Sequence, residues 1–193
     1  MKLSDLEYIP HADLLAPEAL FRVQITRALP TTVRIGRLLL PPSTLMNGRF
    51  DLNGVPVGYF GEAPETAAYE SLCRREVRSI SLEMLKKRSL ICVQAQEKLR
   101  LVDLRPHARA WPVLQSLRIG HTQELAWEAL MQGFAGVVYR SAQQLGMDCF
   151  AIFGDALRSL KFVWSERLVE RSTECLHVTL AETVCRSRLV LAP

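Results

Sequence analysis

The chain has 193 residues, of which 49% are hydrophobic and 23% are charged. This is the composition of an ordinary globular protein, so a mainly disordered chain is excluded and a single domain over residues 1–193 is expected. The net charge of +4 favours anionic partners, but the basic residues are scattered and form no long run. We therefore expect no direct binding to nucleic acid.

Cysteine and histidine usage gives no sign of a metal site. The five cysteines include no C-x-x-C pair, and the four histidines are not spaced with them as ligands would be. Cys92, Cys149 and Cys175 lie in apolar runs, which predicts small core residues. The first residues lack a secretory-signal pattern, and no apolar run is long enough to span a bilayer. We expect a reduced, cytoplasmic protein without membrane contacts.

The first 46 residues contain one clear strand. Residues up to 17 suggest a turn-rich arm. Residues 19–25, with the sequence ALFRVQI, predict a strand with Phe21 on one face and Arg22 on a polar face, where Arg22 would face solvent or belong to a site. Residues 33–40 fit either a strand or a helical turn, because the surrounding prolines argue against longer regular structure.

Residues 47–78 predict a loop, a short strand, a turn and a helix. The Asn-Gly pair at 47–48 marks a turn, because glycine adopts positive φ without steric cost. Residues 56–60 form an apolar, strand-like run, and Pro64 fits the first turn of a helix. The helix carries Glu70 next to its expected buried stripe. That stripe consists of Ala67, Ala68, Leu72 and Val77.

The middle of the chain predicts strands and then helices. A short strand and turn is expected over 79–87. Residues 89–95 and 99–104 predict two strands, and the short link between them predicts an antiparallel hairpin. Helices are expected at 108–117 and 122–132, the second with Thr122 as its N-cap and Gly133 as its stop.

The last third predicts further strands. These are expected at 136–139, 149–153, 162–169 and 176–180. A frayed basic tail around Arg186 and Arg188 would follow. Ser141 comes directly after the first of these strands, without the G-x-S-x-G pattern of a hydrolase nucleophile. Its surroundings alone favour a cap on the next turn over a ligand contact.

Arg49, Tyr59 and Glu70 are the polar groups that would converge around the strand and helix of residues 56–72. A cation, an aromatic hydroxyl and a carboxylate suit a site that holds a phosphate-bearing ligand and stabilises a sugar cation. Each has a structural alternative. Glu70 and Arg74 could form a solvated helix pair, Tyr59 could be strand core, and Arg49 could be a surface charge. Spacing alone favours these alternatives.

The run GRFDLNGVPVGYFGEAPETAAYES, at residues 48–71, resembles the core signature of the RES domain family, named for an arginine, a glutamate and a serine. Two further blocks resemble the family, one before this run and one after it, and the three blocks stand in the family's order. LFRV at 20–23 is similar to its early aromatic–arginine pair. GVVYRS at 136–141, followed by CFAIF at 149–153, is similar to its segment with the named serine. One departure is Asp51, where the family usually has asparagine, which adds negative charge beside Arg49.

The resemblance implies an α+β fold similar to that of ADP-ribosyltransferases. We expect central, mostly antiparallel strands with flanking helices, a core at about 20–153 and C-terminal strands to about 180. It also implies an enzyme that cleaves the nicotinamide–ribose bond of NAD. NAD would be a substrate rather than a recycled cofactor, which agrees with the lack of a G-x-G-x-x-G motif.

The resemblance also assigns roles to five residues. Glu70 would stabilise the sugar cation, and Arg22 and Arg49 would bind the pyrophosphate. Tyr59 would stack on nicotinamide, and Ser141 would hydrogen-bond the nicotinamide end or its ribose. Glu70, Arg22 and Ser141 form the expected catalytic set. The expected NAD-binding set is Arg22, Arg49, Tyr59 and Ser141.

Three acceptors for the ADP-ribosyl group are compatible with the resemblance. We rank inorganic phosphate first, as in an NAD phosphorylase, then water and then a protein side chain. Family members are commonly toxins neutralised by a DNA-binding, Xre-type antitoxin, so a cognate antitoxin is an expected partner. The oligomeric state is open, with a homodimer among the options. A non-catalytic nucleotide-binding module is the alternative from another class.

Overall fold

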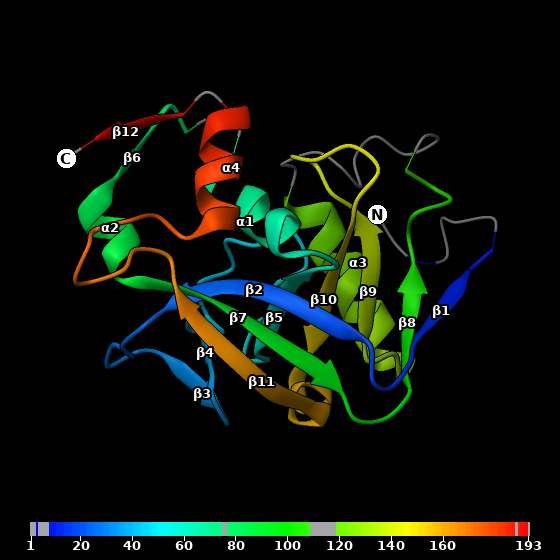
Figure 1. The fold of residues 1–193 in the computed structure, drawn as a ribbon. Coiled ribbons are helices and arrows are strands. Elements are labelled where there is room, and N and C mark those ends of the chain that lie inside the picture. Colours follow the sequence, from blue (N-terminus) through cyan, green and yellow to red (C-terminus); the bar gives the residue numbers. More distant parts are fainter. Residues whose placement is uncertain (1–2, 4–7, 75–76, 109–118, 188, 193) are drawn as a thin grey trace.

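The computed structural model describes residues 3, 8–74, 77–108, 119–187 and 189–192. Its central feature is a curled sheet of eight strands in the order β1-β8-β9-β10-β5-β2-β7-β11 (Figure 1). Neighbouring strands are antiparallel except for β8 and β9. The expected α+β class with a mostly antiparallel sheet and flanking helices is therefore confirmed.

The described elements follow one another along the chain as strands with helices between them. The strands are β1 (His11–Leu14), β2 (Ala19–Ile25), β3 (Val33–Ile35), β4 (Leu38–Leu40), β5 (Val57–Gly61), β6 (Ser79–Ser81), β7 (Arg88–Ala95), β8 (Leu99–Asp103), β9 (Gly136–Arg140), β10 (Asp148–Phe153), β11 (Leu160–Arg167) and β12 (Val190–Ala192). The helices are α1 (Pro64–Leu72), α2 (Leu82–Lys86), α3 (Ile119–Met131), a 3-10 helix (Gly154–Ser159) and α4 (Val178–Ser187).

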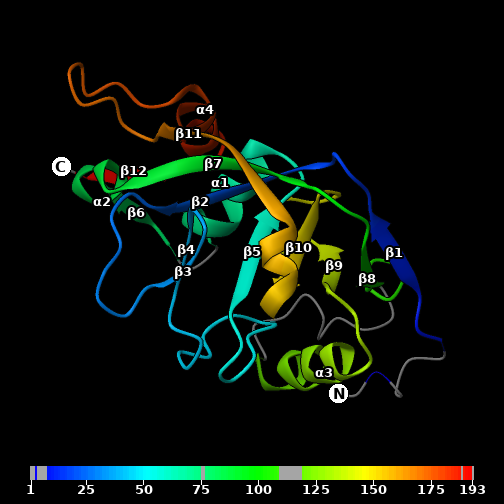
Figure 2. The ribbon, with the colours of Figure 1, turned by 90° about the horizontal axis from the view of Figure 1, so that it is seen from below.

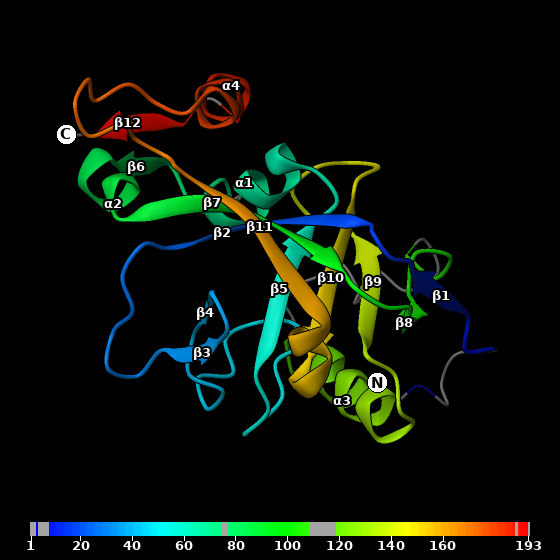
Figure 3. The same cartoon turned by 60° about the horizontal axis from the view of Figure 1, so that its bottom comes forward.

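The sheet is made of two halves that meet at a narrow seam between β5 and β2. β10 pairs with every residue of β5, whereas β2 is in register with β5 only at Phe21 and Gly61. Beyond that point, β2, β7 and β11 cross over the other strands (Figure 3). Apolar side chains from both halves form one core cluster, including Leu20, Ile91 and Phe150, and this cluster holds the halves together.

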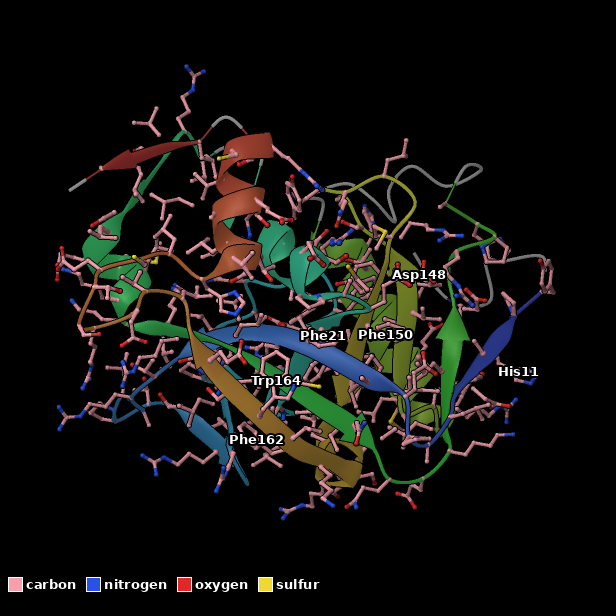
Figure 4. The ribbon with its side chains drawn as sticks, in the orientation of Figure 1. His11, Phe21, Asp148, Phe150, Phe162 and Trp164 are labelled. Carbon is pink, nitrogen blue, oxygen red and sulfur yellow. The ribbon has the colours of Figure 1, made fainter. Side chains whose placement is uncertain are left out.

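Helices cover the two outer faces. α3 packs on the half that contains β9 and β10, with Leu125 and Ala129 among the buried residues of that cluster. α1 and α4 lie on the other side of the molecule and pack with β2 and β7 (Figure 2). On this second half Phe21 and Trp164 face one another, with ring centroids 6.0 Å apart (Figure 4). α1 lies close to the seam between the halves.

Most strand predictions are confirmed. The apolar strands expected near 19–25, 56–60, 89–95, 136–139 and 149–153 all form, with small shifts at their ends. β10 is buried at every residue, as a central strand without polar alternation should be. The undecided residues 33–40 form the β3–β4 hairpin, and residues 79–87 form β6 and α2.

The predicted hairpin of β7 and β8 is wrong. β7 pairs with β2 and β11, whereas β8 pairs with β1 and β9. The short link at 96–98 crosses from one half of the sheet to the other, and Gln96 N donates to Ser159 O at its start. Two strands joined by a short link therefore need not pair where a sheet divides. The N-terminal residues, which were expected to form a turn-rich arm, also contain the strand β1.

The predicted strand at 176–180 and the frayed tail after it are wrong. Residues from Val178 form α4, whose buried Leu180 and Thr183 are spaced three apart and face α1. The β-branched residues in this segment favoured a strand. The segment forms a helix because its buried residues recur at helical spacing. Arg186 lies in α4, and β12 pairs in parallel with β6. Arg188 lies outside the described residues.

Further corrections concern helix ends and one cysteine. The helix predicted at 108–117 falls almost entirely outside the described residues. α3 begins at Ile119, so Thr122 is not its N-cap, and its hydroxyl instead donates to Arg49 O. The stop at Gly133 is confirmed, with φ of +80°. α1 ends before Val77, and Cys175 is exposed rather than in the core.

No helix in the described part of the chain is long and apolar enough to cross a membrane.

Gly136 tests the tight packing of β9 against β10. A Cβ at this position would collide with Ala151 O and lie 3.0 Å from Ile152 Cα, and both are backbone atoms that cannot move aside. We expect Gly136→Ala to lower the free energy of unfolding by more than about 2 kcal/mol. Urea denaturation of purified protein measures this change.

Gly120 in α3 is the matched control. Nothing lies within 4 Å of a Cβ added there, so Gly120→Ala should leave stability unchanged or raise it by up to about 1 kcal/mol. Equal effects of the two substitutions would contradict the packing described for β9.

Candidate active site

Glu70 is placed by the burial pattern of α1. Pro64 occupies the first turn, and Ala67, Ala68 and Leu72 are buried, which fixes the rotation of the helix. Glu70 lies at the edge of this buried stripe in the last turn. Its side chain is 23% exposed, so it lies partly inside the protein. The solvated pair with Arg74 is therefore not its main interaction, and Arg74 Nε instead donates to Glu70 O at 3.4 Å.

One oxygen of Glu70 is held by the loop that follows β9. Oε1 accepts hydrogen bonds from Ser141 Oγ at 2.5 Å, Ala142 N at 3.0 Å and Gln143 N at 3.3 Å. Three donors on one carboxylate oxygen fix its position. The geometry thus joins α1 to a loop about 70 residues further along the chain.

Ser141 is fully engaged in this arrangement. Its hydroxyl donates to Glu70 and accepts from Gln143 N at 3.1 Å and Gln144 N at 2.9 Å. A serine hydroxyl has one hydrogen and two lone pairs, so these bonds use its full capacity. Ser141 therefore both caps its own turn and orients Glu70. A contact from Ser141 to nicotinamide or ribose, as predicted, would require one of these bonds to break.

Arg49 faces the second oxygen of Glu70. Its Nη2 lies 3.8 Å from Glu70 Oε2, and its side chain is only 9% exposed, so the surface-charge interpretation is wrong. The guanidinium carbon lies 4.6 Å from the centroid of the Tyr139 ring, which stabilises a buried cation. Burial raises the pKa of Tyr139 well above its ordinary value, and Arg49 opposes part of that rise.

The loop that carries Arg49 is tied to β5 through Tyr59. The Tyr59 hydroxyl donates to Asp51 Oδ1 at 2.8 Å and accepts from Phe50 N at 2.8 Å, while Asp51 Oδ2 accepts from Gly48 N at 2.6 Å. Burial and then Asp51 raise the pKa of Tyr59. A Cβ on Gly48 would collide with the Tyr59 hydroxyl, so glycine is required there. The unusual Asp51 thus helps to fix the turn that presents Arg49.

Arg22 is half-buried rather than fully exposed on a solvent-facing strand surface. The β3–β4 hairpin covers this face of β2, where Gln24 Nε2 donates to Arg37 O. Arg22 Nη1 donates to Tyr59 O at 2.9 Å, but its Nε is buried and has no hydrogen-bond partner in the part of the chain that the structure describes. Burial lowers the pKa of Arg22 to about 10. No carboxylate among the described residues forms an ion pair with it.

The five predicted site residues are therefore linked, at different distances. Glu70, Arg49 and Ser141 form one contact group. Tyr59 joins this group through the loop that holds Arg49, and Arg22 joins through the backbone oxygen of Tyr59.

The sequence analysis missed Tyr139 and Cys149, which lie in register on β9 and β10. Burial and then the charge of Glu70 raise the pKa of Cys149, so this thiol is buried close to the site. Tyr139 could have been found, because it stands two residues before Ser141 on a strand and so shares its face. No group of three His, Cys, Asp or Glu side chains in the described ranges is arranged to hold a metal ion.

The comparisons with known proteins identify the family and the fold. The family model described as "RES domain" matches residues 19–169. The chain belongs to the RES domain family. The match includes every residue of the group around Glu70, together with Arg22.

A solved structure shows the same fold for this RES domain. It is a chain of the M. tuberculosis MbcT–MbcA toxin–antitoxin complex, with a TM-score of 0.59 and 15% sequence identity. The alignment covers 81% of this chain and 86% of that one. At this identity the likeness concerns the fold alone. No curated protein matches the sequence.

A charged network at the strand ends anchors the Ser141 loop of the RES domain. Asp148, labelled in Figure 4, accepts hydrogen bonds from Arg105 Nη1 and Arg140 Nη1, each at 2.6 Å. Arg105 also binds Asp103, and Asp148 N donates to Glu62 Oε1 at 2.7 Å. Both ends of the loop, at β9 and β10, are thereby fixed by charge-assisted bonds.

The unpaired burial of Arg22 predicts a stability cost. A desolvated cation without a carboxylate partner disfavours the folded state. We expect Arg22→Met to raise the free energy of unfolding by about 1 kcal/mol at pH 7, as measured by urea denaturation. Because burial lowers the pKa to about 10, the cost is present in full below pH 10 and declines above it, where the folded protein releases the proton first.

Arg158→Met is the control, because Arg158 lies on the surface with a side chain that is 75% exposed. This substitution should change stability by less than about 0.5 kcal/mol. A clear loss of stability in Arg22→Met would mean that Arg22 is a supporting core residue rather than a strained one.

Proposed function

We propose that this RES domain cleaves the bond between ribose C1′ and nicotinamide in NAD. The supporting observation is the set of contacts made by the two oxygens of the Glu70 carboxylate. One of its oxygens is fixed by three donors, while the other lies beside a buried guanidinium. A preorganised carboxylate of this kind stabilises positive charge that develops in a transition state.

The proposed bond cleavage needs little proton transfer. The C1′–N electron pair leaves with nicotinamide, which becomes neutral, and the ribose acquires oxocarbenium character. Glu70 stabilises that charge through its second oxygen, as carboxylates do in glycoside cleavage. The leaving group starts as a cation, so a strong general acid is not required. A single central carboxylate is sufficient for this chemistry.

The two arginines supply binding for the anionic part of the substrate. A guanidinium binds two phosphate oxygens in parallel, which suits a pyrophosphate. Among the described residues the buried Nε of Arg22 has no hydrogen-bond partner, which supports a role for this guanidinium in binding a ligand. Arg49 is held next to Glu70 and aligns the second oxygen of the carboxylate. Stacking of Tyr59 on nicotinamide stays a prediction.

Inorganic phosphate is the acceptor that we propose first. An oxygen of phosphate would form a bond to C1′ and release a proton to solvent, giving ADP-ribose 1-phosphate. Water would give ADP-ribose, and a protein side chain would give a modified protein. The related fold in the toxin–antitoxin complex supports a toxin role and an antitoxin partner for this chain. Such depletion of NAD would explain toxicity.

Glu70→Gln tests the central assignment. The amide keeps the size of the side chain but removes the charge, so we expect NAD cleavage to fall by at least about a thousandfold while the protein stays folded. Glu65→Gln in the first turn of α1 is the matched control and should keep normal activity. Mass spectrometry of the products, with and without phosphate, measures the rate and identifies the acceptor.

Two outcomes would contradict the proposal. Equal NAD loss with and without Glu70 would reject its role. NAD binding without cleavage at any phosphate concentration would favour the non-catalytic binding module.

Ser141→Ala tests whether Ser141 acts through Glu70. Loss of the 2.5 Å hydrogen bond should lower kcat about tenfold to a hundredfold with little change in KM, because the carboxylate is no longer held in place. In the Glu70→Gln background the same substitution should have almost no further effect. A full, additive loss in the double variant would show that Ser141 contacts the substrate independently.

A further inference from the structure

The middle of the Ser141 loop, residues 141–147 between β9 and β10, is bonded to α1 by a contact outside the group around Glu70. Thr66 Oγ1 donates a hydrogen bond to Gln144 Oε1 at 2.9 Å. Thr66 lies four residues before Glu70 on α1, so the two side chains share a face of the helix. Thr66 is 0% exposed and cannot reach a substrate. Any effect of its hydroxyl on the chemistry therefore passes through the loop.

The close approach of β5 to α1 holds Thr66 in place. A Cβ on Gly61, the last residue of β5, would lie 2.9 Å from Thr66 Cβ and 2.8 Å from Ala67 N. Only glycine allows the helix to pack this closely on the strand end. Threonine also has few side-chain rotamers in a helix, so this packing gives its hydroxyl a fixed direction.

Gln144 connects Thr66 to the hydroxyl that holds Glu70. The backbone N–H groups of Gln143 and Gln144 donate to Ser141 Oγ at 3.1 and 2.9 Å. These bonds occupy both lone pairs of the hydroxyl, which leaves its one hydrogen for Glu70 Oε1. The side chain of Gln144 is bonded to Thr66, so one residue links the buried helix face to the orientation of the Ser141 hydroxyl.

The ends of the loop are held by other bonds. Ser141 N donates to Met147 O at 2.8 Å, and Glu62 N donates to Asp148 O at 3.1 Å. Asp148 N donates in return to Glu62 Oε1 at 2.7 Å. Loss of the contact between α1 and the middle of the loop should therefore loosen the loop without unfolding the protein.

We propose that Thr66 and Gln144 are positioning residues for the cleavage of NAD. The hydrogen bond between their side chains fixes the middle of the loop, and the loop in turn fixes the Glu70 carboxylate. The inference rests on the proposed function, because it states how the acid of that reaction is kept in place. The contribution is geometric, since a displacement of about 1 Å in a reacting group can cost about a hundredfold in rate.

Kinetics of Thr66 and Gln144 variants test the proposal. Thr66→Val removes the hydroxyl and keeps the shape, so kcat for NAD should fall about threefold to thirtyfold with KM within about twofold of wild type. Thr66→Ser restores the hydroxyl and should recover most of the rate. Gln144→Met should lower kcat by a similar factor, and the double variant with Thr66→Val should be no slower than the slower single variant.

Thr183→Val is the matched control. Thr183 is 1% exposed, and its hydroxyl donates to Thr179 O at 2.7 Å within α4 rather than to the loop. The same chemical change at an equally buried threonine should leave kcat within about twofold of wild type.

Amide hydrogen exchange, followed by NMR, gives a readout that does not depend on activity. The N–H groups of Ala142 and Gln143 donate to Glu70 Oε1 at 3.0 and 3.3 Å. Thr66→Val and Gln144→Met should each speed exchange of these two amides about tenfold, whereas Thr183→Val should not change it. If wild-type protein does not cleave NAD, the proposed function fails, and the exchange rates alone decide whether the bond positions the loop.

Three results would overturn the assignment. An equal loss of kcat in Thr183→Val, or no recovery in Thr66→Ser, would assign the effect to general stability. Additive losses in the double variant would show that the two residues act separately. Unchanged exchange at Ala142 and Gln143 would show that the bond does not restrain the contacts of Glu70.

Discussion

The hydrogen bonds between Glu70 and the Ser141 loop are the interaction on which the site depends. They join the last turn of α1 to the end of β9, so a helix packed on one half of the sheet is fixed to a strand of the other half. The same bonds leave one carboxylate oxygen directed at Arg49. Without these bonds Glu70 would be an ordinary residue at the edge of α1. The charged network at Asp148 would then fix a loop that has no contact with the carboxylate.

The rest of the site is arranged around that acid by buried polar contacts. Asp51 and Tyr59 hold the turn that presents Arg49, and the Tyr139 ring lies against the guanidinium. These interactions are costly to bury unless each group is satisfied, and most of them are. Arg22 is the exception in this group, since its buried Nε has no hydrogen-bond partner within the described ranges.

Local patterns predicted much of the fold and less of its connectivity. The apolar run 149–153 predicted a strand because it is buried on both faces, and the alternation of residues 19–25 predicted another. Pairing depends on distant segments, so the β7–β8 hairpin was wrong, and α4 was hidden by β-branched residues. The contact of Glu70 with Ser141 was beyond spacing arguments, since 71 positions separate the two residues. Only the resemblance to a family brought those residues together before the structure.

Through the seam between β5 and β2, the packing of the protein interior affects the geometry of the site. Arg22 lies on one side of this seam and the Ser141 loop on the other, and the strands share a single register pair there. The angle between the two halves is therefore set by how the apolar side chains between them fit, including Leu20 and Phe150. A methyl group gained or lost in this apolar cluster would therefore change the angle between the two halves. The distance between the Arg22 guanidinium and the Glu70 carboxylate would change with it.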